Sequence, residues 1–217
     1  SSAWIAVGLL IGAYLNYKLV APRLRAYTEI ADDAITIPDF FEKRFKDKSR
    51  LLRVISSLVI VIFFTLYTSA GVVAGGKLFE ASFGLSYELG LFLTAGVVVA
   101  YTLFGGFLAV SLTDFVQGCI MFVALVTVPV VTFMVLGGTD PILTELNTID
   151  PTLLQMTTGV TVLGVISSMA WGLGYFGQPH IIVRFMAIAT LKEVRAARLI
   201  GMSWMLVTLI GAVATGI

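Results

Sequence analysis

The chain has 217 residues, of which 58% are hydrophobic and only 12% are charged. A soluble globular chain usually carries about 25% charged residues, so the composition argues against a soluble fold. One histidine and one cysteine are too few for a disulfide framework or a multi-ligand metal site. A formal net charge of +1 provides no field that would attract nucleic acid, so we expect no such partner.

Six apolar stretches are long enough to cross a lipid bilayer as helices. A hydrocarbon core of about 30 Å takes about 20 residues at a rise of about 1.5 Å per residue. Backbone groups in lipid must pair internally, and these stretches lack the alternation of barrel strands, so we expect an all-α membrane protein. The six predicted transmembrane helices are Ser1–Val20, Leu52–Phe79, Glu88–Phe104, Thr113–Leu136, Thr158–Ala187 and Ala197–Ile217.

Lysine and arginine predict how these helices are oriented, because basic residues concentrate in cytoplasmic connections. Thirteen of the fourteen lie beside the first or the fifth connection, and only Lys77 falls on the other side. With six alternating helices, both chain ends are then expected at the outer face. Because the chain starts and ends within apolar stretches, we also interpret it as an internal fragment. The thirteen are Lys18, Arg23, Arg25, Lys43, Arg44, Lys46, Lys48, Arg50, Arg53, Arg184, Lys192, Arg195 and Arg198.

The first connection carries a helix-start signal. Thr36–Asp39 has the spacing of a capping box with a proline inside it, and aromatic and charged residues then alternate. This pattern predicts a short amphipathic helix on the cytoplasmic membrane surface, at about residues 36–50. Ser111–Asp114 repeats the capping spacing and predicts the start of the fourth transmembrane helix.

The fifth stretch contains three glycines and a proline within the segment 169–180. Pro179 has no N–H for the carbonyl of Tyr175, and each glycine costs about 1 kcal/mol in helix propensity. We therefore predict that the backbone unwinds between Trp171 and Pro179, which frees polar groups for a bound molecule. Trp171, Tyr175 and Gln178 would add hydrogen-bonding side chains. A plain proline kink is the alternative.

Gly172, Gly174 and Gly177 also match the letters of a dinucleotide-binding motif. That motif works only where a strand leads into a helix whose N-terminus holds a pyrophosphate. Here it follows a predicted membrane helix with no strand nearby, so we expect no organic cofactor.

Other candidates are weaker. Tyr67, in the second stretch, lies near the depth of the predicted break and cannot bond back to its own helix, so it could face a pocket. Asp114 is interpreted either as a solvated carboxylate at a helix N-terminus or as a cation contact. His180 and Cys119 are expected to be structural.

Three strings, Phe63–Gly71, Tyr101–Gln117 and Trp171–Ala187, closely resemble the sodium/solute symporter family, and the similarity extends over the whole chain. The resemblance implies a partial inverted-repeat, leucine-transporter-like core in a bacterial cytoplasmic membrane, with residues 1–217 as core helices two to seven. It further implies sodium-coupled import of a small solute by alternating access, and the Gly-Gln-Pro-His string favours proline.

The resemblance also assigns residues. Tyr67, Trp171 and Tyr175 match family positions implicated in proline binding, and Pro179 matches a motif proline beside them, with Gly172 and Gly174 in the same unwound segment. Asp114 matches an acid associated with sodium movement. The helices that build the family's main sodium site are not among the six, so no sodium ligand is named here, and this fragment alone should not transport.

The residues independently favour a net-neutral solute. A zwitterion such as L-proline needs apolar walls and backbone dipoles, and no Asp or Glu lies at mid-depth to hold a cationic one. The alternatives are another small amino acid or carboxylate as the solute, or a solute-sensing module of a signalling kinase. An enzyme is not expected, because His180 alone supplies no nucleophile and base.

Overall fold

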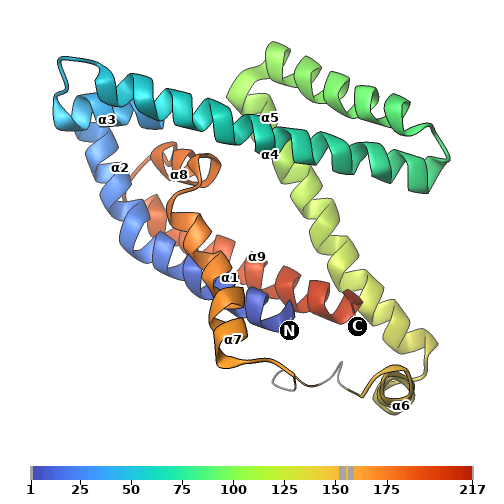
Figure 1. Cartoon of the computed structure of the whole chain (residues 1–217). Helices are drawn as coiled ribbons and strands as arrows, with labels where there is room; N and C mark the ends of the chain where they lie inside the picture. The colour runs from blue at the N-terminus through green and yellow to red at the C-terminus, as the bar shows by residue number, and fades with distance from the viewer. Residues whose placement is uncertain (1, 152–154, 156–158, 217) are drawn as a thin grey trace. The chain divides into compact units, whose positions relative to one another are not determined.

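A computed structural model describes residues 2–151, 155 and 159–216, and every regular element in these ranges is helical (Figure 1), as composition predicts. The residues Ser1, Thr158 and Ile217, which bound three predicted helices, lie outside the described ranges. The elements are α1 (Ser2–Leu15), the π-helix η1 (Asn16–Val20), α2 (Ala21–Ile30), α3 (Ile37–Phe45), α4 (Leu51–Phe83), α5 (Tyr87–Val135), α6 (Thr139–Ile149), α7 (Val162–Met169), the 3₁₀ helix η2 (Ala170–Phe176), α8 (Pro179–Met186) and α9 (Glu193–Gly216).

Within the described residues, four helical runs are long and apolar enough to cross a membrane. The apolar run that contains α7 and η2 is shorter, at Val162–Phe176. The count of six transmembrane helices is therefore not confirmed. The four runs are Ala3–Ile30, Leu51–Phe83, Tyr87–Val135 and Glu193–Gly216.

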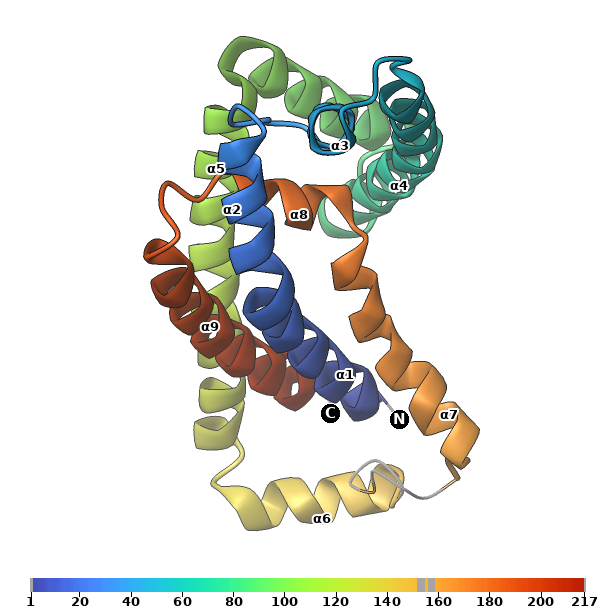
Figure 2. The ribbon, with the colours of Figure 1, turned by 90° about the vertical axis from the view of Figure 1, so that its left-hand side faces the viewer.

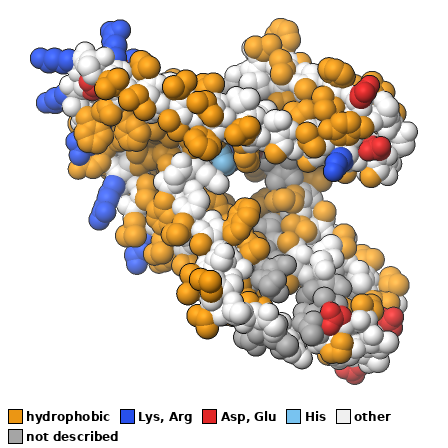
Figure 3. Space-filling view, viewed as in Figure 1, with side chains coloured by type: hydrophobic (Ala, Val, Ile, Leu, Met, Phe, Trp, Pro, Cys, Tyr) orange, Lys and Arg blue, Asp and Glu red, His pale blue; other side chains and the backbone are white. Residues whose placement is uncertain are grey.

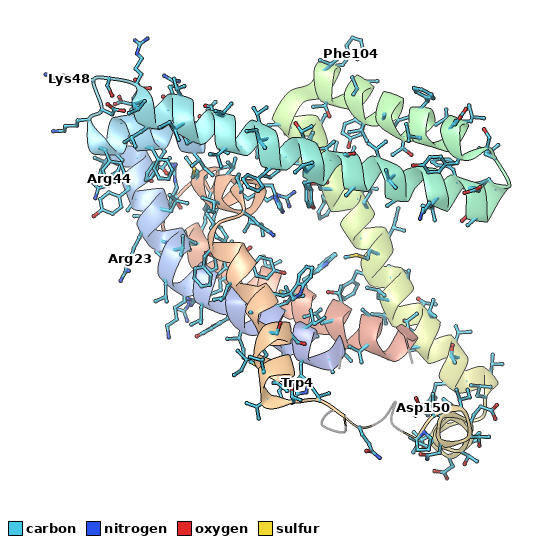
Figure 4. All side chains as sticks on the ribbon, viewed as in Figure 1. Trp4, Arg23, Arg44, Lys48, Phe104 and Asp150 are labelled. Atoms are coloured by element: carbon cyan, nitrogen blue, oxygen red, sulfur yellow. The ribbon has the colours of Figure 1, made fainter. Side chains whose placement is uncertain are left out.

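The predicted third and fourth transmembrane helices are separated at one residue rather than by a connection of residues 105–112. Helix α5 consists of two helices that meet across a kink at Gly106, where the backbone departs from helical geometry with φ 54° and ψ −147°. Glycine tolerates this left-handed φ because it has no Cβ, so one residue bends the helix without a loop. Phe104, which is 94% exposed, stands beside this bend (Figure 4).

The predicted helix start at Ser111–Asp114 is too late in the chain. Helix resumes directly after Gly106, so Ser111 and Asp114 lie about one and two turns beyond the kink. Thr113 donates its hydroxyl to the Val110 carbonyl at 2.9 Å, a back-bond within the helix rather than a cap. Asp114 consequently does not lie at a helix N-terminus.

The first transmembrane helix is longer than predicted, because helix continues past Val20 to Ile30. Proline at position 22 does not interrupt it, because the widened π-turn lies immediately before. There the backbone N–H of Ala21 reaches the Asn16 carbonyl, five residues back.

The chain forms two compact units, one of residues 1–48 and 120–217 and the other of residues 49–119. In the first unit, α1 runs parallel to α7 and η2 on one side and antiparallel to α9 on the other (Figures 1 and 2). The start of α1 and the end of α9 therefore lie at the same end of this unit (Figure 2).

The opposite end of this unit has a small core of apolar side chains. Ala21, Phe185 and Val194 are buried there, and Tyr17 packs edge-on against Phe185 with ring centroids 4.7 Å apart. The core joins η1 and α2 to α8 and the start of α9. It fixes α8, the helix that follows the break, against the first helical run.

Helix α3 forms where the capping pattern predicts a helix. The Thr36 hydroxyl accepts a hydrogen bond from the backbone N–H of Asp39 at 3.3 Å, and Lys46 ends the helix in a left-handed conformation. Ile37 and Phe40 are buried while Lys43 pairs with Asp39 at 3.1 Å, so the helix is amphipathic. Basic side chains gather over α2 and α3, and acidic ones lie over α6 (Figure 3).

The second unit is built on α4 and the first part of α5. Gly84, with φ 65°, ends α4 in a left-handed turn that reverses the chain. Near that turn the two helices approach closely, because a Cβ on Gly90 would lie 2.7 Å from the Cβ of Phe79.

Candidate functional site

The predicted break in the fifth apolar stretch is present. Regular α-helix ends at Met169, and the 3₁₀ helix η2 follows as far as Phe176. The backbone N–H groups of Gly177 and Gln178 both donate to the Gly174 carbonyl at 3.1 Å, and α8 starts only at Pro179. A continuous α-helix and a simple kink are both ruled out for this segment.

Pro179 explains where the new helix begins. The residue before a proline is pushed out of helical geometry, and Gln178 has φ −76° and ψ 114°. Proline suits the first position of a helix, where an N–H would have no intrahelical partner. The carbonyl of Tyr175 consequently loses the partner it would have in a continuous helix.

Asn16 of η1 supplies the missing partner. Its side-chain Nδ2 donates to the Tyr175 carbonyl at 2.8 Å, and Asn16 is only 1% exposed. Sequence reasoning missed this residue. The sequence feature that could have identified it is an amide side chain within an apolar predicted membrane helix, because polar side chains there usually have a specific partner.

Gly172 lets the first helical run approach the break. It is buried, and a Cβ on Gly12 of α1 would lie 2.6 Å from the Gly172 carbonyl carbon. Gly8 contacts Met169 in the same way, since a Cβ there would lie 2.5 Å from the Met169 Cα. Small residues allow this backbone-to-backbone contact, which is how helices in membranes pack most closely.

Trp171 and Tyr175 point in different directions. In a 3₁₀ helix of three residues per turn, side chains four residues apart diverge by about 120°, against about 40° in an α-helix. Trp171 is 67% exposed, whereas Tyr175 is half-buried against the first helical run. The two rings therefore do not form one wall in this conformation.

Tyr175 lines a cavity of about 350 Å³ in the first unit, at the low end of the range for ligand pockets. Asn16, Tyr17, His180 and Arg184 contribute polar groups to it. The apolar side includes Met202 and Met205 of α9, together with Phe185. Such a mixture of hydrogen-bonding groups and methionines suits a small solute with both polar and apolar parts.

Tyr67 and Asp114 belong to the second unit. Tyr67 is exposed on α4, with its ring centroid 5.6 Å from that of Phe64, and Asp114 is half-buried on α5. The predicted site residues that the structure brings together are the ones along η2 and the start of α8: Trp171, Gly172, Gly174, Tyr175 and Pro179. In the described ranges, no group of three or more His, Cys, Asp or Glu could hold a metal ion.

An apolar helical chain with a helix broken at a polar cavity has the features of a secondary transporter. Over residues 1–217 the chain matches the family described as SSF: Sodium:solute symporter family, and it belongs to that family. The resemblance predicted from its sequence strings is thereby confirmed.

The chain is also similar to curated bacterial proteins over its full length. It is 64% identical to the osmoregulated proline transporter OpuE and 58% identical to the high-affinity proline transporter PutP, both of Bacillus subtilis. It is 56% identical to sodium/proline symporter 2 of Staphylococcus saprophyticus. These names describe transporters, not enzymes.

The chain spans less than half the length of these relatives, covering 44%, 46% and 42% of them in the same order. No solved structure matches the chain. Family and helices together identify part of an integral membrane protein of a bacterial transporter family.

Proposed function

We propose that the protein containing this chain imports L-proline together with sodium by alternating access. The observation that carries the proposal is the break at η2, where regular α-helix stops within an apolar helical run and a polar cavity adjoins it. The names of the relatives, all proline transporters or sodium/proline symporters, support the choice of solute and coupling ion.

The local chemistry supports a net-neutral solute. Helices α7, η2 and α8 contain no Asp or Glu, so nothing on them would compensate a cationic solute. A zwitterion can instead use backbone dipoles for its charges and the ring of Tyr175, which lines the cavity, for its apolar part. We propose that the ring of Trp171 joins it in another conformation of the transport cycle. Gly172 lets the first helical run pack directly against that backbone, Gly174 leaves room beside the Gln178 side chain, and Pro179 keeps the segment unwound.

We further propose that the chain supplies core helices two to seven of a leucine-transporter-like fold, with both of its ends at the outer face. The basic cluster over α2 and α3 would then face the cytoplasm (Figure 3). Helix α3 would lie on the cytoplasmic membrane surface. Asp114 is proposed to act on the sodium path, while the principal sodium ligands are proposed to lie on helices outside this chain.

Uptake of radiolabelled L-proline into proteoliposomes holding the full-length protein tests this function. An inward sodium gradient should drive accumulation, and both Trp171→Ala and Tyr175→Ala should raise the apparent proline constant by about tenfold or more. Leu173→Ala is the matched control, because Leu173 lies between them on η2 and is 68% exposed. Unchanged kinetics in both variants, or uptake without sodium, would contradict the proposal.

Competition by unlabelled amino acids and carboxylates in the same assay distinguishes proline from another small solute. If one of them is taken up with a lower apparent constant than proline, the choice of solute is wrong while the site proposal stands. A sensing role is not favoured, because the curated relatives are named as transporters.

A further inference from the structure

We propose that Asn16 is a positioning residue for solute binding, which holds the unwound segment in shape through the carbonyl of Tyr175. The inference rests on the proposed function, because it concerns the same solute site. It adds a residue from a different helix, 159 positions away along the chain.

The burial of Asn16 shows that its amide has a specific role. Asn16 is 1% exposed, and burying an amide costs about 1–3 kcal/mol unless it is hydrogen-bonded. Nδ2 makes one bond of 2.8 Å to the Tyr175 carbonyl, while the buried Oδ1 finds no hydrogen-bond partner among the residues that the structure describes. The amide is therefore retained for the one bond it makes, which is to the unwound segment.

The bond replaces the one that proline removes. In a continuous α-helix the Tyr175 carbonyl would accept from the N–H of residue 179, and Pro179 has none. A main-chain carbonyl left unpaired within an apolar region costs several kcal/mol, so an unwound segment needs a donor from elsewhere. Asn16 is that donor, and it allows the break to persist.

Two features of the first helical run place Asn16 against the break. The close contacts at Gly8 and Gly12, two turns and one turn before Asn16 respectively, bring the two backbones together. Asn16 then begins the π-helix η1, and π-turns within helices frequently occur at functional sites.

The bond also bears on the solute site, because Tyr175 carries both the bonded carbonyl and a ring that lines the cavity. When the donor is removed, the segment is free to change its turn geometry, and the ring moves with it. The solute must then order this segment when it binds, and that cost weakens binding. Once the site is saturated the cost has been met, so we expect little change in the maximal rate of uptake.

The test uses the full-length protein with Asn16→Leu, which removes the donor at similar volume. We expect the apparent proline constant to rise about tenfold or more, with the maximal rate per molecule within about twofold of wild type. Thr28→Val is the matched control, because Thr28 is equally buried and its hydroxyl bonds only to Leu24 of its own helix, at 2.8 Å. It should leave the constant unchanged. A fall in rate that merely follows membrane abundance would overturn the proposal.

A double-mutant cycle with Pro179→Ala tests the mechanism. Alanine at position 179 restores a backbone N–H that can donate to the Tyr175 carbonyl. In the Pro179→Ala background, Asn16→Leu should therefore raise the apparent proline constant by less than about threefold. Rescue of this kind is expected only if the carbonyl is the point of action. Full additivity of the two substitutions would overturn the mechanism.

Hydrogen exchange of residues 170–178 in lipid nanodiscs gives a readout that does not depend on transport. Asn16→Leu should accelerate exchange in this segment by about tenfold, and Thr28→Val should not. Unchanged exchange, or faster exchange with an unchanged proline constant, would overturn the role of Asn16. If wild type fails to take up proline, the proposed function fails, whereas the exchange result still shows whether Asn16 holds the break.

Discussion

The Arg25 guanidinium donates to the main-chain carbonyl of Met186 at 3.0 Å and so closes the C-terminal end of α8. The same group reaches the Ala189 carbonyl at 3.2 Å and forms ion pairs with Asp33 at 3.0 Å and Glu29 at 3.4 Å. Arg25 is buried and so is its bond to Met186, whereas the Asp33 and Glu29 side chains are exposed, so the carbonyl bonds contribute more than the ion pairs. One side chain thereby ties α2 to the helix that follows the break.

Arg25→Gln should therefore destabilise the protein, because an amide cannot reach both carbonyls and the carboxylates at once. Hydrogen bonds to charged groups contribute about 1.5–3 kcal/mol each, so a loss of about 2–4 kcal/mol in the free energy of unfolding is expected. The measurement is the thermal midpoint of the full-length protein in detergent. Arg23→Gln is the control, because Arg23 projects from the same helix into the open (Figure 4). Equal midpoints for the two variants would show that the buried contacts contribute nothing.

The sequence predicted the break at η2 correctly because the cause is local. Glycine propensity and the missing N–H of Pro179 act within a few residues, and no tertiary contact can give Pro179 an N–H to continue the helix. Its partner could not be predicted in the same way. The Asn16 bond depends on how two helical runs pack, and sequence spacing carries no information on that packing.

The bend at Gly106 shows the opposite case. Residues around it suggested a connection of several residues, but helix continues on both sides, and a single glycine with positive φ supplies the whole kink. The sequence pattern therefore predicted the position of the interruption within α5 but overestimated its length. The length depends on the φ of one glycine, which residue propensities do not predict.

Gly12→Ala tests the contact between α1 and η2. The new methyl group would lie 2.6 Å from the Gly172 carbonyl carbon, which is backbone and cannot move aside without separating the helices. We expect the free energy of unfolding to fall by about 2 kcal/mol or more, since overpacking typically costs about 1–3 kcal/mol. The amount of folded protein in the membrane should fall clearly as well. Fluorescence-detected size-exclusion chromatography measures the amount of folded protein, and the same measurement after a series of heating steps reports the loss of stability.

Gly177→Ala is the control for that substitution, because nothing lies within 4 Å of a Cβ at Gly177. It should fold to the level of wild type. If Gly12→Ala is equally well tolerated, the first helical run does not pack against η2 through its backbone as described.

Pro179→Ala should impair solute binding without unfolding the protein. Alanine lifts the restriction on Gln178 and offers an N–H to the Tyr175 carbonyl, so the break can partly rewind. We expect the apparent proline constant to rise about fivefold while the thermal midpoint stays the same or increases. Proline uptake and thermal unfolding of one preparation measure both quantities. A lower midpoint with an unchanged constant would mean that Pro179 serves stability rather than the site.

Asp114→Asn tests the proposed sodium path. The substitution preserves shape and removes the negative charge, so a cation that passes this carboxylate would be held less well. We expect the apparent sodium constant for proline uptake to rise about fivefold or more, with the proline constant at saturating sodium within about twofold of wild type. Glu88→Gln is the matched control, because it removes an acidic charge from the first turn of the same helix α5. An equal response of both variants, or no change in sodium dependence, would place Asp114 outside the path of the ion.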